Sequence, residues 1–243
     1  MSVLLTGAAG YVGQAVREVL RREHEVRLLD LAPIPGEPDA IVGDIADFAL
    51  VSQAVDGVDA IVNLAIANTY QTPEEPLEAS VLGTVNLLEA ARRHGVGRVV
   101  HMSSGAVVTG YDRDTFVHVE LPFKYTGMYC FSKAMQEHAC HDYAMMYGLT
   151  IVALRPWSVC DARSGTAKNG QPLTYDSGFF GLLDRYDLGE ACSAALRAPL
   201  TGFQPFHVMA TDEAERCFDV ERTRRMLGWR PKVTFAHLKE QRS

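Results

Sequence analysis

Short apolar runs alternate with longer amphipathic runs through the first 155 residues of this 243-residue chain. The apolar runs predict six strands, at Val3–Thr6, Val26–Asp30, Ala40–Val42, Ala60–Asn63, Arg98–Met102 and Ile151–Arg155. The amphipathic runs predict four helices, at Val12–Arg22, Phe48–Val55, Leu77–His94 and Tyr129–Tyr147. Strands that are apolar on both faces are typical of a parallel sheet covered by helices on each side. The expected fold class is therefore α/β, with a doubly wound parallel sheet and right-handed crossovers.

A glycine-rich turn joins the first predicted strand to the first predicted helix. Its sequence, Thr6-Gly7-Ala8-Ala9-Gly10-Tyr11-Val12-Gly13, has the spacing G-x-x-G-x-x-G. Glycines let the backbone approach a pyrophosphate closely, and the helix N-terminus supplies free N–H groups. With strand, turn and helix all in place, the pattern predicts a Rossmann-type dinucleotide site rather than a plain tight turn. The cofactor contacts expected here are Gly7, Gly10, Tyr11, Val12 and Gly13.

Two aspartates end the next two predicted strands. Asp30 can accept hydrogen bonds from the adenosine ribose and would repel the 2′-phosphate of NADP, and Leu31 beside it offers no positive charge. The sequence therefore favours NAD. Asp44 and Ile45 lie after the third strand, where Asp44 could bind the adenine amino group or cap the helix at Phe48. The remaining predicted cofactor contacts are Leu64, Ala65, Ile66, Met102, Pro156 and Trp157.

Tyr129 and Lys133 open the last long helix of the first 155 residues. Residues four apart share a helix face, so the phenol and the ammonium point in the same direction. A free tyrosine titrates near ~10, and a nearby cation lowers its pKa toward the range of a useful base. Both residues are expected to contact the cofactor as well. A plain surface pair is the alternative, and the glycine-rich turn upstream favours the catalytic interpretation.

Two serines end the fifth strand, at the sheet edge where the reactive end of a cofactor is expected. Ser104 is predicted to stabilise the substrate oxygen, with Ser103 in support, whereas a strand-end cap is the alternative for both. Ser158 and Arg163 are further candidates for substrate contacts, because Arg163 could hold a carboxylate. No metal site is expected, since the histidine pair at 138 and 141 has no third ligand.

The pattern weakens after Arg155. Residues 156–181 predict mainly loop, followed by a helix at Leu188–Arg197, a strand at Phe203–Val208 and a helix from Val220 to about Leu227. We expect residues 1–155 to form the NAD-binding core. Residues 156–243 are expected to form a small C-terminal substrate-binding cap together with the remaining sheet and helix elements, in one compact domain.

Composition narrows the class of protein. A net charge of −7 argues against a nucleic-acid-binding surface, and no apolar run is long enough to span a membrane. The N-terminal residues show no signal-peptide pattern. Five scattered cysteines without a CxxC pair indicate neither disulfides nor zinc. A cytoplasmic protein is the simplest expectation.

These motifs together resemble the extended short-chain dehydrogenase/reductases, the NAD-dependent epimerase/dehydratase family. The matching segments are TGAAGYVG (6–13), Asp30, GDI (43–45), NLA (63–65), GTVNLLEAARRHGVGRVVHMSS (83–104), YCFSK (129–133), LRP (154–156) and RRMLGWRP (224–231). The resemblance implies that Ser104, Tyr129 and Lys133 carry the chemistry. It also implies a homodimer through the helices at Leu77–His94 and Tyr129–Tyr147.

Departures from the family pattern narrow the expected reaction. Gly105 and Ala106 stand where sugar dehydratases carry an Asp-Glu pair, so a dehydratase is not expected. The serine run is one residue longer than in many relatives, so alignment from its glycine end would put Gly105 at the catalytic position. The length resembles uronate dehydrogenases, although these have Asn-His after the serines.

The expected function is hydride transfer between NAD and a hydroxyl-bearing carbon of a sugar or sugar acid. A sugar epimerase that keeps its NAD and a non-catalytic NAD sensor are the alternatives.

Overall fold

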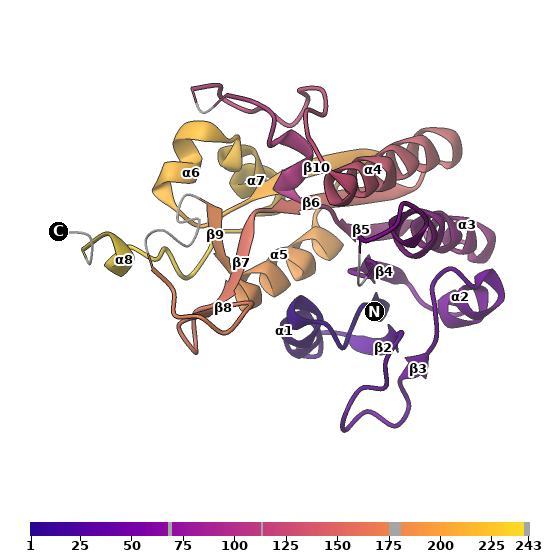
Figure 1. Cartoon of the computed structure of the whole chain (residues 1–243). Helices are drawn as coiled ribbons and strands as arrows, with labels where there is room; N and C mark the ends of the chain where they lie inside the picture. The colour runs from indigo at the N-terminus through magenta and orange to yellow at the C-terminus, as the bar shows by residue number, and fades with distance from the viewer. Residues whose placement is uncertain (68–69, 113, 175–180, 241–243) are drawn as a thin grey trace.

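The computed structural model describes residues 1–67, 70–112, 114–174 and 181–240 (Figure 1). Its strands are β1 (Ser2–Thr6), β2 (Glu25–Asp30), β3 (Ile41–Val42), β4 (Ala60–Asn63), β5 (Arg98–Met102), β6 (Thr150–Pro156), β7 (Ser158–Asp161), β8 (Thr166–Ala167), β9 (Leu182–Asp184) and β10 (Phe203–Val208). Its α-helices are α1 (Tyr11–Leu20), α2 (Phe48–Val55), α3 (Gly83–His94), α4 (Met128–Tyr147), α5 (Arg185–Arg197), α6 (Asp212–Cys217), α7 (Val220–Leu227) and α8 (His237–Glu240). A π-helical turn, η1 (Pro76–Leu82), and a 3₁₀ turn, η2 (Gly105–Val108), complete the elements.

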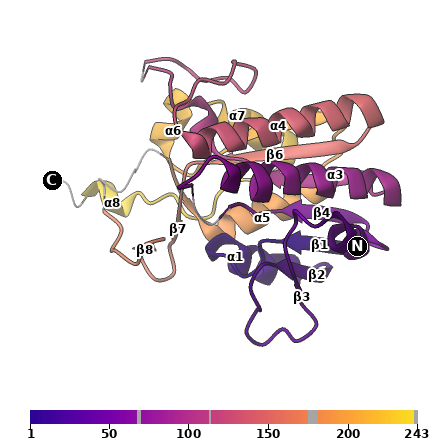
Figure 2. The same cartoon turned by 45° about the vertical axis from the view of Figure 1, so that its right-hand side comes forward.

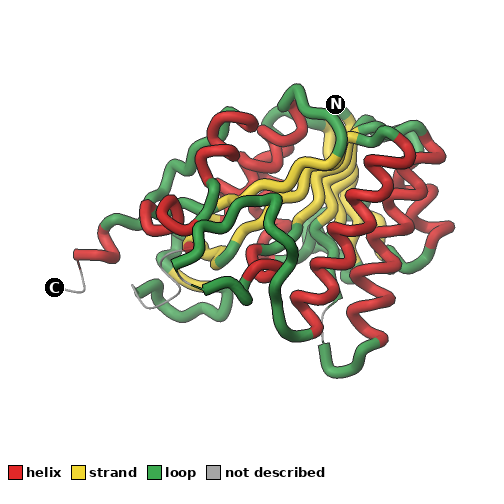
Figure 3. The backbone as a smooth tube through the Cα atoms, turned by 90° about the horizontal axis from the view of Figure 1, so that it is seen from above, coloured by secondary structure: helices red, strands yellow, loops and turns green. Residues whose placement is uncertain are grey.

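Seven strands form one parallel sheet in the order β10-β6-β5-β4-β1-β2-β3. The order in which successive strands are added reverses at β1, because β2 and β3 lie on one side of it and β4 lies on the other. Figure 3 shows these strands running side by side between two groups of helices. The predicted Rossmann-type α/β fold is therefore confirmed. Open sheets of this kind bind ligands at the carboxyl ends of the strands, next to such a switch point.

Two apolar cores cover the two faces of the sheet. Val3, Leu5 and Val100 belong to the core under α1 and α5, whereas Leu4 and Ile61 belong to the core under α2, α3 and α4. Alternate residues of one strand thus enter opposite cores, which explains why the buried strands read as continuous apolar runs. Figure 2 shows α3 and α4 side by side, and the two helices are in contact.

The long helix predicted at Leu77–His94 has two parts. The turn η1 runs from Pro76 to Leu82 with π-helical bonding, and α3 continues from Gly83. A residue larger than glycine would not fit at position 83, where a Cβ would lie 2.4 Å from the Ile45 side chain. The close approach of α3 to the segment after β3 accounts for this glycine in a helix.

Residues 156–174 of the segment predicted as loop are more regular than expected, and residues 175–180 of that segment lie outside the described residues. β7 pairs with β8 in an antiparallel hairpin and with β9 in parallel, forming a second sheet of three strands. These strands are short and contain serine, aspartate and threonine, so they lack a strong apolar pattern. α5 also begins at Arg185 rather than at Leu188, because the Asp184 side chain caps it by accepting hydrogen bonds from the backbone N–H groups of Tyr186 and Asp187.

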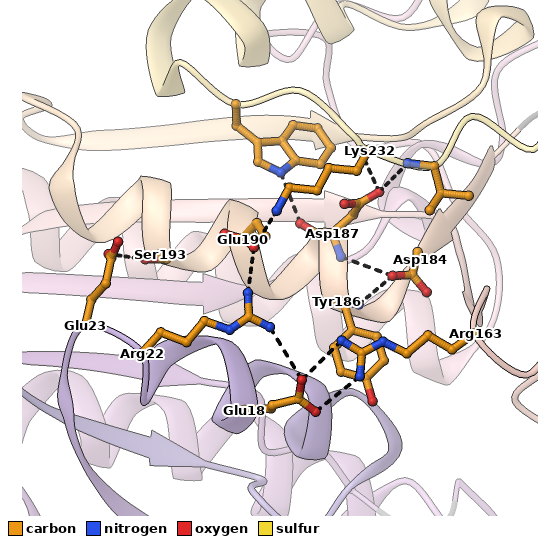
Figure 4. A network of polar contacts seen from close by, with 12 residues as sticks. Glu18, Arg22, Glu23, Arg163, Asp184, Tyr186, Asp187, Glu190, Ser193 and Lys232 are labelled. Carbon is orange, nitrogen blue, oxygen red and sulfur yellow. Dashed lines mark hydrogen bonds and ion pairs between the residues drawn. The ribbon is translucent and has the colours of Figure 1, made fainter.

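The C-terminal part of the chain returns to the main sheet. β10 forms its edge beside β6, and α5 packs on α1. Beyond α7, the Asp187 carboxylate accepts hydrogen bonds from the backbone N–H groups of Lys232 and Val233, both at 2.9 Å (Figure 4). α6 and α8 were not expected from the sequence. Among the described helices, none is long and apolar enough to cross a bilayer.

Candidate active site

A crevice of about 590 Å³ lies along the carboxyl ends of the central strands. All of the residues predicted to contact the cofactor line it, together with Ser103 and Ser104. Its two ends differ. Asp30 and Asp44 lie where β2 and β3 end, whereas Ser104, Tyr129 and Trp157 lie by the ends of β5 and β6. We call the end with the two aspartates the binding end of the crevice and the end with Ser104 and Tyr129 the reacting end.

The glycine-rich turn is packed so closely that side chains are excluded. Gly7 has a φ of +68°, and a Cβ there would lie 2.8 Å from the Leu64 carbonyl carbon. A Cβ on Gly13 would lie 2.1 Å from the Gly7 oxygen. Gly10 precedes α1 without any side-chain cap. The first N–H groups of α1 are therefore not satisfied by a cap, as a site for anionic oxygens requires.

Asp30 holds this turn as well as lining the crevice. Its Oδ2 accepts a hydrogen bond from the Ala9 N–H at 2.8 Å, and its Oδ1 accepts one from the Ala32 N–H at 3.0 Å. Each carboxylate oxygen retains a further lone pair for a ligand hydroxyl. Asp30 thus couples the conformation of the turn to the binding end of the crevice.

Asp44 is not the cap of α2, which was one of its two predicted roles. That cap is Asp47, whose Oδ1 accepts hydrogen bonds from the backbone N–H groups of Ala49 and Leu50. Asp44 accepts instead from the Ala46 N–H at 2.9 Å and lines the crevice. Of the two alternatives for Asp44, the helix cap is excluded because two aspartates precede α2 and the nearer one, Asp47, makes the cap.

Ser104 and Tyr129 meet at the reacting end of the crevice. The Ser104 hydroxyl lies close enough to the Tyr129 phenol to lower its pKa, and the Ser104 Oγ accepts a hydrogen bond from the Ala106 N–H at 3.1 Å. Gly105 cannot take the place of Ser104, because a Cβ there would lie 2.4 Å from the Trp157 ring. The structure thus brings the hydroxyl of Ser104, and not residue 105, against the phenol.

Lys133 lies one turn after Tyr129 in α4 and is only 2% exposed. Its Nζ donates a hydrogen bond to the Met102 carbonyl at 2.7 Å. Burial lowers the pKa of Lys133 to about 7, although the neighbouring Glu137 carboxylate opposes the shift. The ammonium is therefore held at the end of β5, within the crevice lining, and can lose its proton near neutral pH.

The expected effect of Lys133 on Tyr129 is not found. Burial raises the pKa of Tyr129, and the side-chain hydrogen bond with Ser104 is what opposes the rise. A phenolate needs solvation or donors, and the crevice wall removes water from the phenol. Because burial lets Lys133 lose its proton near neutral pH, it carries little positive charge where the phenol titrates, and Ser104 is the group that favours the phenolate.

Ser103 points away from Ser104 into a buried ion pair. Its hydroxyl donates to the Glu137 carboxylate, and Glu137 also forms two hydrogen bonds with the Arg155 guanidinium, at 2.9 and 2.7 Å. Both ionic side chains are nearly inaccessible, at 0% and 2% exposure. Ser103 still lines the crevice, but its hydroxyl is engaged by the protein.

The two other predicted substrate contacts, Ser158 and Arg163, are not among the residues that line the crevice. Arg163 forms an ion pair with Glu18 at 3.1 Å, and its guanidinium carbon lies 3.3 Å from the centroid of the Tyr186 ring (Figure 4). Its charge is thus neutralised on the outer side of α1. In this structure Arg163 therefore lies outside the crevice lining, in an exposed ion pair.

Two residues, one in contact with Tyr129 and one in the crevice lining, carry no sequence signal. The Tyr70 ring meets the Tyr129 ring edge-on, with centroids 5.5 Å apart and an angle of 83° between planes. Lys168 lines the crevice from the segment after β8. Neither belongs to a motif or a periodic run, so only the tertiary structure could find them.

Comparison with known proteins matches residues 3–175 to the NAD dependent epimerase/dehydratase family. The chain belongs to this family. The matched range covers the glycine-rich turn, Asp30, Ser104, Tyr129 and Lys133, which are the residues that the crevice brings together.

Members of the family with different activities resemble the chain. It is 37% identical over 158 residues to a uronate dehydrogenase of Pseudomonas syringae pv. tomato, a match that covers 63% of this chain and 58% of that protein. It is 28% identical over 186 residues to a UDP-glucose 4-epimerase of Corynebacterium glutamicum, covering 72% and 56%. The chain thus spans less than two thirds of the length of either family member.

Solved structures in the family extend the likeness to nearly the whole chain. A mutant uronate dehydrogenase from Agrobacterium tumefaciens, in complex with NAD, superposes with a TM-score of 0.82 at 28% identity. The match covers 98% of this chain and 88–89% of the corresponding uronate dehydrogenase chains. The C-terminal segment after residue 175, which the family match does not reach, therefore has a structural counterpart there.

Proposed function

We propose that this chain is an NAD-dependent dehydrogenase that oxidises a hydroxyl-bearing carbon of a sugar acid. The observation that carries the proposal is the contact between Ser104 and Tyr129 at one end of a crevice that starts at an uncapped, glycine-lined helix N-terminus. A hydroxyl pair of this kind can hold a substrate oxygen and exchange its proton.

The residues of the crevice fit NAD. The free N–H groups at the start of α1 suit a pyrophosphate, and the tight packing around Gly7 and Gly13 leaves the backbone accessible there. Asp30 offers acceptors for ribose hydroxyls and repels a 2′-phosphate. The chemistry that NAD supplies when bound is acceptance of the hydride.

The side chains at the other end would manage the proton. Ser104 would hold the substrate hydroxyl, and Tyr129 would take its proton as the carbon–hydrogen bond breaks. Lys133, fixed on the Met102 carbonyl, would lie beneath the phenol at the β5 edge. Gly105 and Ala106 themselves carry no carboxyl group for an elimination, which disfavours a dehydratase.

A sugar acid is the favoured substrate class because uronate dehydrogenases recur among the similar sequences and structures. The match to a UDP-glucose 4-epimerase supports a second candidate, in which a tightly held NAD returns the hydride. The two functions differ in whether NADH accumulates.

The test is incubation of the purified chain with NAD and glucuronate or galacturonate while NADH absorbance is followed. Accumulation of NADH with a sugar acid supports the dehydrogenase. Interconversion of UDP-sugars without NADH would support the epimerase, and NAD binding without any turnover would support a sensor. A parallel thermal-shift titration should show stabilisation by NAD and less by NADP.

Tyr129→Phe is the decisive variant in this assay. It removes the proton acceptor while keeping the ring that meets Tyr70, so NAD binding should persist and turnover should fall by about 100-fold or more. Turnover close to that of the unaltered chain would remove Tyr129 from the mechanism.

A homodimer in the cytoplasm completes the proposal. The dimer would form through α3, η1 and α4, which lie side by side and expose Leu77, Leu82 and Met145 (Figure 2). Met145 is 71% exposed, which is unusual for a large apolar side chain. All five cysteines are free thiols, as suits a reducing compartment. Light scattering after size-exclusion chromatography tests the dimer, and a monomer would refute it.

A further inference from the structure

The charges along the crevice are unevenly distributed. Two carboxylates, Asp30 and Asp44, stand at the binding end. The cations of the described lining are Lys133 and Lys168. Lys133 is buried and bound to the Met102 carbonyl, so Lys168 is the exposed cation of the lining that the structure describes.

Lys168 is held by a short hairpin that reaches the reacting end. β8 pairs with β7 through Ala167↔Cys160, so Lys168 follows next to Val159, which also lines the crevice. β7 itself starts directly after Trp157, whose ring packs against Gly105 beside Ser104. Lys168 thus follows β8 in the second, three-stranded sheet, and it lies across from a strand residue that is two positions after Trp157.

The backbone on each side of Lys168 is fixed. The Ala167 N–H donates to the Gln171 carbonyl at 2.8 Å, and the Gly170 N–H donates to the Ala167 carbonyl at 2.9 Å. This turn holds the position of the residue while its side chain stays exposed. Among the described residues, none forms an ion pair with Lys168.

The other groups of this region that could bind an anion are already paired or are assigned to the cofactor. The N–H groups at the start of α1 suit the cofactor pyrophosphate, and Arg163 is paired with Glu18 (Figure 4). Arg185, at the start of α5, is paired with Asp161 at 2.6 Å. A negatively charged substrate entering a chain with a net charge of −7 therefore finds one unpaired cation in the described lining, Lys168.

We propose that Lys168 binds the carboxylate of the substrate and so selects sugar acids over neutral sugars. The inference rests on the proposed function and names the residue that reads the acid group. It replaces Arg163, the cation that the sequence indicated, with a lysine five residues further on.

The experiment compares glucuronate with its neutral amide, glucuronamide, in the unaltered chain and in Lys168→Gln, Lys168→Arg and Lys232→Gln. Lys232 is a matched control, because it is an exposed lysine that is paired with Glu190 of α5 and is not among the crevice lining (Figure 4). Lys168→Gln should raise KM for glucuronate about tenfold, as expected for loss of a charge-assisted hydrogen bond. It should leave kcat, KM for the amide and the Kd of NAD unchanged.

Lys168→Arg should restore most of the affinity for glucuronate, and Lys232→Gln should behave as the unaltered chain. An unchanged KM for glucuronate, or an equal rise for acid and amide, would overturn the inference. A weaker Kd for NAD in Lys168→Gln would overturn it too, because the lysine would then serve the pyrophosphate.

A binding measurement separates this inference from the proposed function. Glucuronate is titrated by calorimetry into the chain loaded with NADH. This complex cannot react, because NADH is already reduced and cannot accept a hydride. If the unaltered chain reduces no NAD with any sugar acid, the dehydrogenase proposal fails. Glucuronate binding that is lost in Lys168→Gln would still support the role of Lys168, and absence of that difference would refute it.

Discussion

At the scale of single residues, the phenol of Tyr129 sets the pH range in which the site can work. Burial raises its pKa, and the hydrogen bond with Ser104 works in the opposite direction. A general base must be deprotonated to act, so kcat/KM for oxidation should rise with pH into the alkaline range. Ser104 then has two effects, since it holds the substrate oxygen and keeps the phenol acidic enough to react.

Ser104→Ala should therefore lower kcat about 100-fold and move the rising limb of the pH profile to higher pH. The limb moves upward because the phenolate loses a hydrogen bond that stabilises it. Ser103→Ala is a matched control, since the Ser103 hydroxyl is engaged by Glu137 and should not influence the limb. The measurement is kcat/KM across neutral and alkaline pH, and a limb at the same pH in both variants would contradict this role of Ser104.

Lys133 should affect the pH dependence of the free energy of unfolding as well as the activity. Its pKa is about 7 in the folded chain, whereas an unfolded lysine keeps its proton up to about 10.5. Between these values the unfolded chain binds more protons, so stability rises with pH across this window and is lost as pH falls through it. Lys133→Met removes this dependence.

Urea unfolding at pH 7, 8 and 9 checks this. The unaltered chain should gain stability relative to Lys133→Met as pH rises, and a Lys232→Met control at the exposed lysine should show the same gain. Equal slopes in all three chains would mean that burial does not disfavour the Lys133 ammonium.

At the scale of elements, α4 is the part that carries the reacting residues and anchors them. Tyr129, Lys133 and Glu137 are four residues apart and so lie on one face of the helix. Lys133 binds the end of β5, and Glu137 binds Arg155 in β6. Arg155 also donates to the Val119 carbonyl at 3.2 Å, which ties the segment between η2 and α4 to the same point.

Breaking this ion pair from one side should be more harmful than removing it. Glu137→Gln and Arg155→Met should each lower the free energy of unfolding by about 3–5 kcal/mol, because each leaves a buried charge unpaired. The double variant should cost less than the sum of the two. A double-mutant cycle by urea unfolding measures the coupling, and additive effects would show that the two charges do not depend on each other.

The sequence predicted most elements of the main sheet and less of the site. Parallel strands buried on both faces are continuous apolar runs, so β1, β4 and β5 were predicted within one residue of their observed bounds. The strands β7 and β8 were missed because two- and four-residue strands with polar side chains have no detectable period.

Within the site, the features that depend on neighbouring residues in the sequence were predicted, whereas those that depend on tertiary packing were not. The glycine turn and the Tyr129–Lys133 spacing are local, and both were predicted. Arg163 was misplaced because nothing in its sequence context indicates that Glu18 would neutralise it. Lys168 reaches the crevice only through the β7–β8 hairpin, and Tyr70 only through its packing on Tyr129.

At the scale of the whole molecule, the C-terminal segment is fastened to the core at α5. Asp187 is the fastening point, because its Oδ2 accepts two backbone hydrogen bonds and its carbonyl accepts one from the Trp229 indole at 3.0 Å (Figure 4). Burial raises the pKa of Asp187, while the backbone N–H groups of Val233 and Lys232 oppose the rise. We infer that the segment is held mainly by the hydrogen-bond acceptor of the Asp187 side chain and less by its negative charge.

Two replacements of Asp187 separate the oxygen from the charge. Asp187→Asn keeps an oxygen that can accept from both N–H groups, so it should change the free energy of unfolding by less than about 1 kcal/mol. Asp187→Ala leaves two buried donors without an acceptor and should lower it by about 2–3 kcal/mol. Limited proteolysis should then cut the alanine variant after α7 first, because local release of this segment precedes global unfolding. If both variants lost equal stability, the negative charge would be the essential feature; if neither did, α7 and the sheet edge at β10 would hold the segment without Asp187.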